Sequence, residues 1–278
     1  MGNNMAQIVK IINDIHFVSD NEKIYECKTN GKLKYQGVAP QVGDFVEFDK
    51  QNKIITKIYP RKNSLLRPNV SNIDQALIVT SLKDPNFSTN LLDKLLLICH
   101  VNNIKPVICI TKKDLVSKNE IKEYKKILNY YKKIGYKVIY NTNKFKLKHI
   151  FKNKTTVFTG QTGAGKSSLI NKLNKDFNFE TGETSKALGR GKHTTRYVTL
   201  VNLYKGKVLD TPGFSNIDLK QLTDEEIKES FIEFNKINCE YKDCKHINEK
   251  NCRIKEAVKE NTILKSRYEN YLKFIEKR

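Results

Sequence analysis

The segment from Gly160 to Ser168, Gly-Gln-Thr-Gly-Ala-Gly-Lys-Ser-Ser, constrains the fold of this chain more than any other feature. It fits the phosphate-loop pattern G-x-x-x-x-G-K-[ST], in which a glycine-rich turn joins a strand to a helix. An apolar run at 155–159 precedes it and a helical pattern begins near Lys166, so the context is that of an α/β domain. The predicted nucleotide-binding residues of this loop are Gly160, Gln161, Thr162, Gly163, Ala164, Gly165, Lys166, Ser167 and Ser168.

The side chains of this loop have separate roles in such a site. The loop N–H groups and the helix N-terminus attract phosphate, and Lys166 is placed to reach the β- and γ-phosphates. The Ser167 hydroxyl is a predicted Mg²⁺ ligand. Asp210 follows a strand at 207–209 and is expected to hold Mg²⁺ directly or through water, while the backbone N–H of Gly213 approaches the γ-phosphate.

A second motif, Thr111-Lys112-Lys113-Asp114, ends another apolar run at 106–110. It matches the guanine-recognition pattern Asn-Lys-x-Asp except that Thr111 replaces Asn. The Asp114 carboxylate would accept hydrogen bonds from guanine N1–H and the 2-amino group, donors that adenine lacks. The Lys112 stem packs across the base, and the shorter Thr111 side chain puts part of the usual support in doubt. We therefore predict GTP and GDP as ligands.

The guanine motif precedes the phosphate loop and the Asp-Thr-Pro-Gly motif at 210–213, whereas ordinary GTPases have the opposite order. Circular permutation explains this order, because a fold tolerates it when its original termini lie close together.

The hydrolytic residues are less clearly marked. Phe214 stands where many GTPases have a Gln that orients the attacking water, so slow intrinsic hydrolysis is expected. The segment 189–196 is a candidate first switch, in which Thr195, favoured over Thr194, would close on Mg²⁺ and the γ-phosphate. His193 is either a residue that places water or a solvated residue facing RNA.

Cys239, Cys244, His246 and Cys252 form a compact cluster of soft ligands. Three thiolates and one imidazole suit a closed, tetrahedral, structural Zn²⁺ site. Unrelated intracellular thiols are the alternative.

The rest of the chain supplies the context. Short alternating strands with turn signals predict a small β-barrel over 1–66. Alternating strands and helices follow over 67–217. The last region, 218–278, is predicted to be charged and helical and to end in a packing helix over 254–278. The polar segment 61–68 is expected to be a linker.

The net charge of +21 favours a polyanionic partner such as nucleic acid. No apolar stretch suits a membrane span or a secretory signal, so we expect a soluble, cytoplasmic protein.

Taken together, the permuted motif order and the Cys-x4-Cys-x-His-x5-Cys cluster resemble the RsgA family of ribosome small-subunit-dependent GTPases over essentially the whole chain. The resemblance implies a multi-domain fold: an N-terminal OB-fold barrel, a circularly permuted P-loop GTPase domain and a mostly helical zinc-binding domain. It also implies a GTPase stimulated by the 30S subunit, with 16S rRNA as a partner, acting late in subunit maturation, and we expect a monomer.

Two other functions stay open at this point. A P-loop ATPase acting on nucleic acid predicts ATP preference, against which Asp114 argues. A nucleotide-gated RNA-binding module with incidental hydrolysis is kept open by Phe214.

Overall fold

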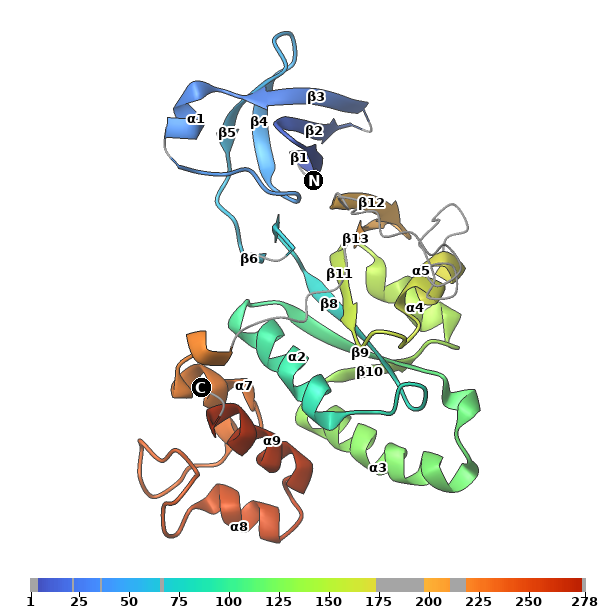
Figure 1. Cartoon of the computed structure of the whole chain (residues 1–278), viewed down its shortest axis with the longest axis vertical. Helices are drawn as coiled ribbons and strands as arrows, with labels where there is room; N and C mark the ends of the chain where they lie inside the picture. Colours follow the sequence, from blue (N-terminus) through green and yellow to red (C-terminus); the bar gives the residue numbers. More distant parts are fainter. Residues whose placement is uncertain are drawn as a thin grey trace, which may run out of the picture. The chain divides into compact units, whose positions relative to one another are not determined.

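A computed structural model of the chain describes residues 5–21, 23–35, 37–65, 68–173, 198–210 and 219–276 (Figure 1). The chain forms two compact units, each built from separate stretches of sequence. The first combines segments 1–76, 144–158 and 170–214, and the second combines 77–143, 159–169 and 215–278. The predicted domain limits of 1–66, 67–217 and 218–278 stay predictions.

The N-terminal part of the first unit is a closed five-stranded barrel, as the sequence predicts. Its strands are β1 (Ala6–Ile12), β2 (Ile15–Asp20), β3 (Lys23–Thr29), β4 (Phe45–Asp49) and β5 (Ile54–Ile58), with the short helix α1 (Gly31–Tyr35) between β3 and β4. The strands pair in the order β1-β2-β3-β5-β4, and β4 returns to β1. This is the topology of an OB-fold, and closure leaves no unpaired sheet edge.

The barrel interior is filled by one face of these strands. The alternating residues produce this face, because successive side chains of a strand point to opposite sides. Its fully buried members are Ile8, Val18, Cys27, Val46 and Ile55.

The segment predicted as a linker has more structure than expected. It contains β6 (Ser64–Leu65), which pairs with β7 (Val70–Ser71). Arg61 forms a two-nitrogen contact with the buried carboxylate of Asp44, at 2.7 and 2.8 Å. A charged pair of this kind fixes the exit of the barrel, which a polar sequence pattern alone does not reveal.

The first unit also contains α4 (Lys144–Phe151), most of β11 (Thr155–Gly160), β12 (Thr199–Leu203) and β13 (Gly206–Asp210). β13 pairs with β11 in parallel and with β12 in an antiparallel hairpin, and β12 pairs with β1. Gly206 permits a close approach in this hairpin, because a Cβ there would lie 1.8 Å from the carbonyl oxygen of Phe151.

The second unit contains the strand that carries the guanine motif, together with its two neighbours in the sheet. β8 (Gln75–Ser81), β9 (Lys105–Thr111) and β10 (Lys137–Tyr140) are neighbours in the sheet, and β9 and β10 are parallel. α2 (Thr89–Val101) packs on β9 and α3 (Lys118–Ile134) packs on β10. Ser88 caps α2, and Ser117 with Glu120 forms a capping box on α3.

The C-terminal region of this unit is helical, as predicted. It comprises η2 (Leu219–Gln221), α7 (Asp224–Ser230), η3 (Phe234–Lys236), α8 (Arg253–Lys259) and α9 (Lys265–Glu276). The prediction of one packing helix over 254–278 is wrong, since α8 and α9 are separate. Asn261 has a positive φ of 59° between them, and the Thr262 hydroxyl donates to the carbonyl of Ala257 at 2.9 Å, which ends α8. No helix among the described residues has the length and apolar character that crossing a membrane requires.

Candidate nucleotide site and metal centre

The phosphate loop lies between the end of β11 and the start of α5 (Lys166–Leu173), as the sequence predicts. Gly160, Gly163 and Gly165 have positive φ angles of 136°, 80° and 88°. At Gly160 a Cβ would lie 1.9 Å from the carbonyl oxygen of Val79, so only glycine fits against β8. The loop therefore combines a left-handed backbone with a close contact to the neighbouring strand.

The Lys166 ammonium lies across this loop. Its Nζ donates to the carbonyl oxygens of Gly160 and Gln161, each at 2.8 Å. Burial lowers the pKa of Lys166. A phosphate oxygen beside the ammonium would supply the negative charge that burial otherwise penalises.

The guanine motif is bonded directly to the phosphate loop. Thr111 ends β9 and is buried, and its hydroxyl donates to the carbonyl oxygen of Ala164 at 2.7 Å. Lys112 has a left-handed φ of 53°, and its ammonium donates to the carbonyl oxygen of Asp84. Asp114 lies in the turn η1 (Lys113–Leu115) with an exposed carboxylate. The structure thus joins two motifs that lie 53 residues apart in sequence.

The structure describes some of the remaining predicted nucleotide-binding residues and not others. Ser167 is half-buried in the first turn of α5, and Thr162 and Ser168 are exposed. Asp210 is the last residue of β13, as predicted from the strand pattern. The other three predicted residues, Gly213, His193 and Thr195, lie outside the described residues.

The predicted metal ligands Cys239, Cys244, His246 and Cys252 converge, with ligand atoms all within 4.8 Å of one another. The His246 Nδ1 lies 3.5 Å from the Cys239 Sγ and 3.4 Å from the Cys252 Sγ, and the two Sγ atoms are 3.9 Å apart. Tetrahedral ligands with metal–sulfur bonds of about 2.3 Å lie about 3.8 Å apart. The donor set and its spacing therefore fit Zn²⁺, with Nδ1 as the histidine ligand.

The burial of this cluster determines the protonation of its thiols. Burial is the largest cause that raises the pKa of Cys244, to about 12, so a bare thiol there is protonated. A divalent cation reverses this preference by stabilising thiolates. The loop that carries His246 is held in place by the Tyr268 hydroxyl, which donates to the His246 carbonyl at 2.7 Å.

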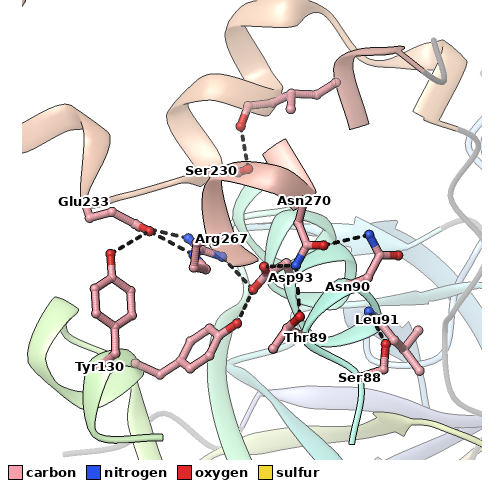
Figure 2. Close-up of polar contacts among 12 residues, drawn as sticks. Ser88, Thr89, Asn90, Leu91, Asp93, Tyr130, Ser230, Glu233, Arg267 and Asn270 are labelled. Atoms are coloured by element: carbon pink, nitrogen blue, oxygen red, sulfur yellow. Dashed lines mark hydrogen bonds and ion pairs between the residues drawn. The ribbon is translucent and has the colours of Figure 1, made fainter. Parts of the chain in front are cut away.

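A buried ion cluster, which the sequence motifs do not reveal, joins α2, α9 and the residue before η3 (Figure 2). Arg267 is 1% exposed and binds Glu233 through two nitrogens and Asp93 through a third, all at 2.8 Å. Burial raises the pKa of Asp93 despite these partners. The one sequence signal is that Asp93 lies between the apolar residues Leu92 and Leu95 of α2.

Comparison with known proteins assigns the family. The family model described as RsgA GTPase matches residues 58–220, and the model of the RsgA N-terminal domain matches residues 6–56. The chain belongs to the RsgA family of GTPases. It is therefore a GTP-hydrolysing enzyme, and the resemblance inferred from the permuted motifs is confirmed.

Individual relatives agree along nearly the whole chain. "Small ribosomal subunit biogenesis GTPase RsgA" of Pediococcus pentosaceus is 43% identical, covering 98% of this chain and 92% of its own length. The protein of the same name from Streptococcus agalactiae serotype V is 40% identical, with 97% and 93% covered. Other members of the RsgA family match as well.

Two solved structures have the same fold. YjeQ from Thermotoga maritima superposes with a TM-score of 0.85 at 32% identity, covering 98% of each chain. YloQ, described as a circularly permuted GTPase, has a TM-score of 0.83 at 31% identity, with 97% of this chain and 92% of that chain covered. The prediction of a barrel, a circularly permuted GTPase domain and a helical C-terminal region that carries a Cys/His cluster is confirmed.

Proposed function

We propose that this GTPase acts in the biogenesis of the small ribosomal subunit and binds GTP at the joined phosphate loop and guanine motif. The observation that carries the proposal is the hydrogen bond from Thr111 to Ala164, since it brings the predicted guanine-reading and phosphate-binding residues into one site. The names of the relatives support the biological role.

In the proposed mechanism, Asp114 accepts hydrogen bonds from guanine while Lys112 packs along the base. Lys166 exchanges its two carbonyl partners for β- and γ-phosphate oxygens, which neutralises charge as the γ-phosphoryl group leaves. Ser167 and Asp210 are the proposed ligands of Mg²⁺, which when bound neutralises charge on the phosphate oxygens. The backbone N–H of Gly213 is the proposed γ-phosphate contact.

Hydrolysis requires a water held in line with the γ-phosphate. Phe214 cannot hydrogen-bond water, so we assign this task to His193, with Thr195 closing on Mg²⁺. Both belong to a segment rich in Arg and Lys, and the small subunit is the proposed partner that contacts it. Intrinsic turnover is therefore slow and the subunit accelerates it.

The partner that we propose is the 30S subunit, with 16S rRNA as the contacting polyanion. The net charge of +21 supports attraction to RNA, and the OB-type barrel supplies a fold suited to oligonucleotides. We propose a cytoplasmic monomer, with a structural Zn²⁺ that holds the C-terminal helices rather than taking part in hydrolysis.

The test measures hydrolysis of GTP and ATP by the purified chain with and without 30S subunits. GTP-selective turnover that the subunit stimulates, lost in Lys166→Ala and less selective in Asp114→Ala, supports the proposal. Preference for ATP, or no response to 30S, contradicts it. If Lys166→Ala loses turnover but binds 30S with GTP as the wild type does, hydrolysis is incidental to a nucleotide-gated binding function.

A further inference from the structure

Asn270 on α9 holds the first turn of α2 (Figure 2). Its Nδ2 donates to the Asp93 carboxylate at 2.6 Å and to the Thr89 hydroxyl at 3.3 Å, while its Oδ1 accepts from Asn90 Nδ2 at 3.1 Å. Asn270 is 3% exposed, so its amide is buried and has partners for both its donor and its acceptor. The turn that it holds begins immediately after residues 84–88, here called the α2-entry loop.

Arg267, one turn earlier on α9, reinforces this attachment. It joins Asp93 of α2 to Glu233 at the start of η3, and the guanidinium lies over the Phe231 ring at 4.3 Å. The Tyr131 hydroxyl of α3 donates to the same Asp93 carboxylate at 2.6 Å. Since Arg267 and Tyr131 both bind the Asp93 carboxylate, α9 is joined to α2 directly and to α3 through this shared carboxylate.

The α2-entry loop contacts the guanine motif and lies beside the phosphate loop. Its Asp84 carbonyl accepts from the Lys112 ammonium of the guanine motif. Its Pro85 carbonyl accepts from the Ser81 hydroxyl at 2.6 Å, and Pro85 Cδ would lie 3.4 Å from a Cβ placed on Gly163 of the phosphate loop. A shift of this loop would therefore move a partner of Lys112 and a neighbour of the phosphate loop together.

Two tyrosines of α9 hold the loop that carries the predicted metal ligand His246. The Tyr268 hydroxyl donates to the carbonyl of His246 and the Tyr271 hydroxyl donates to the carbonyl of Lys245. A single helix of twelve residues thus contacts both the metal-ligand loop and the first turn of α2.

We propose that Asn270 is a positioning residue for guanine-nucleotide binding, acting through the α2-entry loop, and that α9 couples the metal centre to nucleotide affinity. The inference rests on the proposed nucleotide site. Coupling between sites is reciprocal, so a nucleotide that binds this loop conformation also stabilises the contacts of α9. Loss of the Asn270 contacts is expected to weaken GDP binding about tenfold, within the usual range for such coupling.

The first measurement is hydrogen exchange of the wild-type, metal-loaded chain with and without GDP. The expected result is slower exchange of α9 backbone amides with GDP, although no residue of α9 belongs to the nucleotide motifs. Equal α9 exchange in the two samples, at a GDP concentration that protects the phosphate loop, overturns the proposal. Failure of GDP to bind the wild type at all instead contradicts the proposed nucleotide site.

The second measurement is GDP affinity, by titration of a fluorescent GDP analogue well below the melting temperature. Asn270→Ala is compared with Glu269→Ala, which changes the exposed neighbour on the same helix. We expect about tenfold weaker binding for Asn270→Ala and less than twofold change for the control. Equal affinities overturn the proposal. Asn90→Ala removes one of the same contacts from the α2 side and is used in the same way if Asn270→Ala does not fold.

Discussion

The hydroxyl of Thr111 lies 2.7 Å from the carbonyl oxygen of Ala164, so the last residue of β9 is bonded to the backbone of the phosphate loop. The same hydroxyl is 3.4 Å from the carbonyl of Thr80 at the end of β8. A short side chain suffices here because the strand end and the loop approach each other closely. The substitution of Thr for the usual Asn therefore keeps a link between the two motifs.

Replacing Thr111 with Val tests this link. Val has nearly the same shape but cannot donate, which leaves the Ala164 carbonyl without its partner. We expect a loss of about 1 kcal/mol, seen as about fivefold weaker GDP binding. Thr111→Ser keeps the hydroxyl and is expected to bind GDP within about twofold of wild type. Equal affinities for the Val and Ser variants in a fluorescence titration would contradict this role.

Gly160 and Gly163 of the phosphate loop differ in which atoms would lie close to an added Cβ methyl group. Gly160→Ala places a Cβ 1.9 Å from the Val79 carbonyl at a φ of 136°, so we expect a loss of about 3 kcal/mol or more in the free energy of unfolding. Gly163→Ala meets only Pro85 Cδ at 3.4 Å and has a φ of 80°, so about 1–2 kcal/mol is expected. Urea unfolding of both variants measures the difference. The reverse order would show that contact with β8 is not the constraint on this turn.

Local patterns in the amino-acid sequence predict most of the fold and most of the candidate site. The phosphate loop and the four metal ligands are short motifs whose chemistry fixes their residue types, and the barrel strands show in alternation. The cluster of Arg267, Asp93 and Glu233 could not be predicted, because its members lie up to 174 residues apart and meet only through helix packing. Apolar spacing continues across the break between α8 and α9, so the sequence pattern predicts a single helix there.

Asp114 is expected to determine the base that the site accepts. Asp114→Asn replaces a carboxylate acceptor with an amide that also donates, which suits the 2-carbonyl of xanthine in place of the 2-amino group of guanine. We expect GDP affinity to fall by at least about a hundredfold, in line with the cost of unpaired polar groups, while xanthosine diphosphate binds more tightly than GDP. Asp243→Asn, an exposed change outside the site, is the control. Unchanged GDP preference would exclude Asp114 from base recognition.

Arg267 neutralises two buried carboxylates. Its removal is therefore expected to lower the free energy of unfolding by more than the loss of its own hydrogen bonds. Arg267→Met leaves Asp93 and Glu233 buried without a cation, and we expect the free energy of unfolding to fall by about 3–5 kcal/mol. Arg253→Met, at an exposed position that begins α8, is expected to change it by less than about 0.5 kcal/mol. Urea unfolding with GDP absent separates this effect from nucleotide binding. A similar small change for both variants would mean that the buried cluster adds little stability.

Metal content decides between a zinc centre and free thiols. Purified protein is expected to contain about one zinc per chain, since the four ligands leave no open position. Cys252→Ala should abolish metal binding and lower the melting temperature by roughly 5–10 °C, because the ligand loop and α9 lose their common support. Cys27→Ala, at a buried thiol in the barrel, keeps the zinc even if it lowers stability. Elemental analysis of the three proteins is the measurement, and equal metal content in wild type and Cys252→Ala would exclude this cluster as the site.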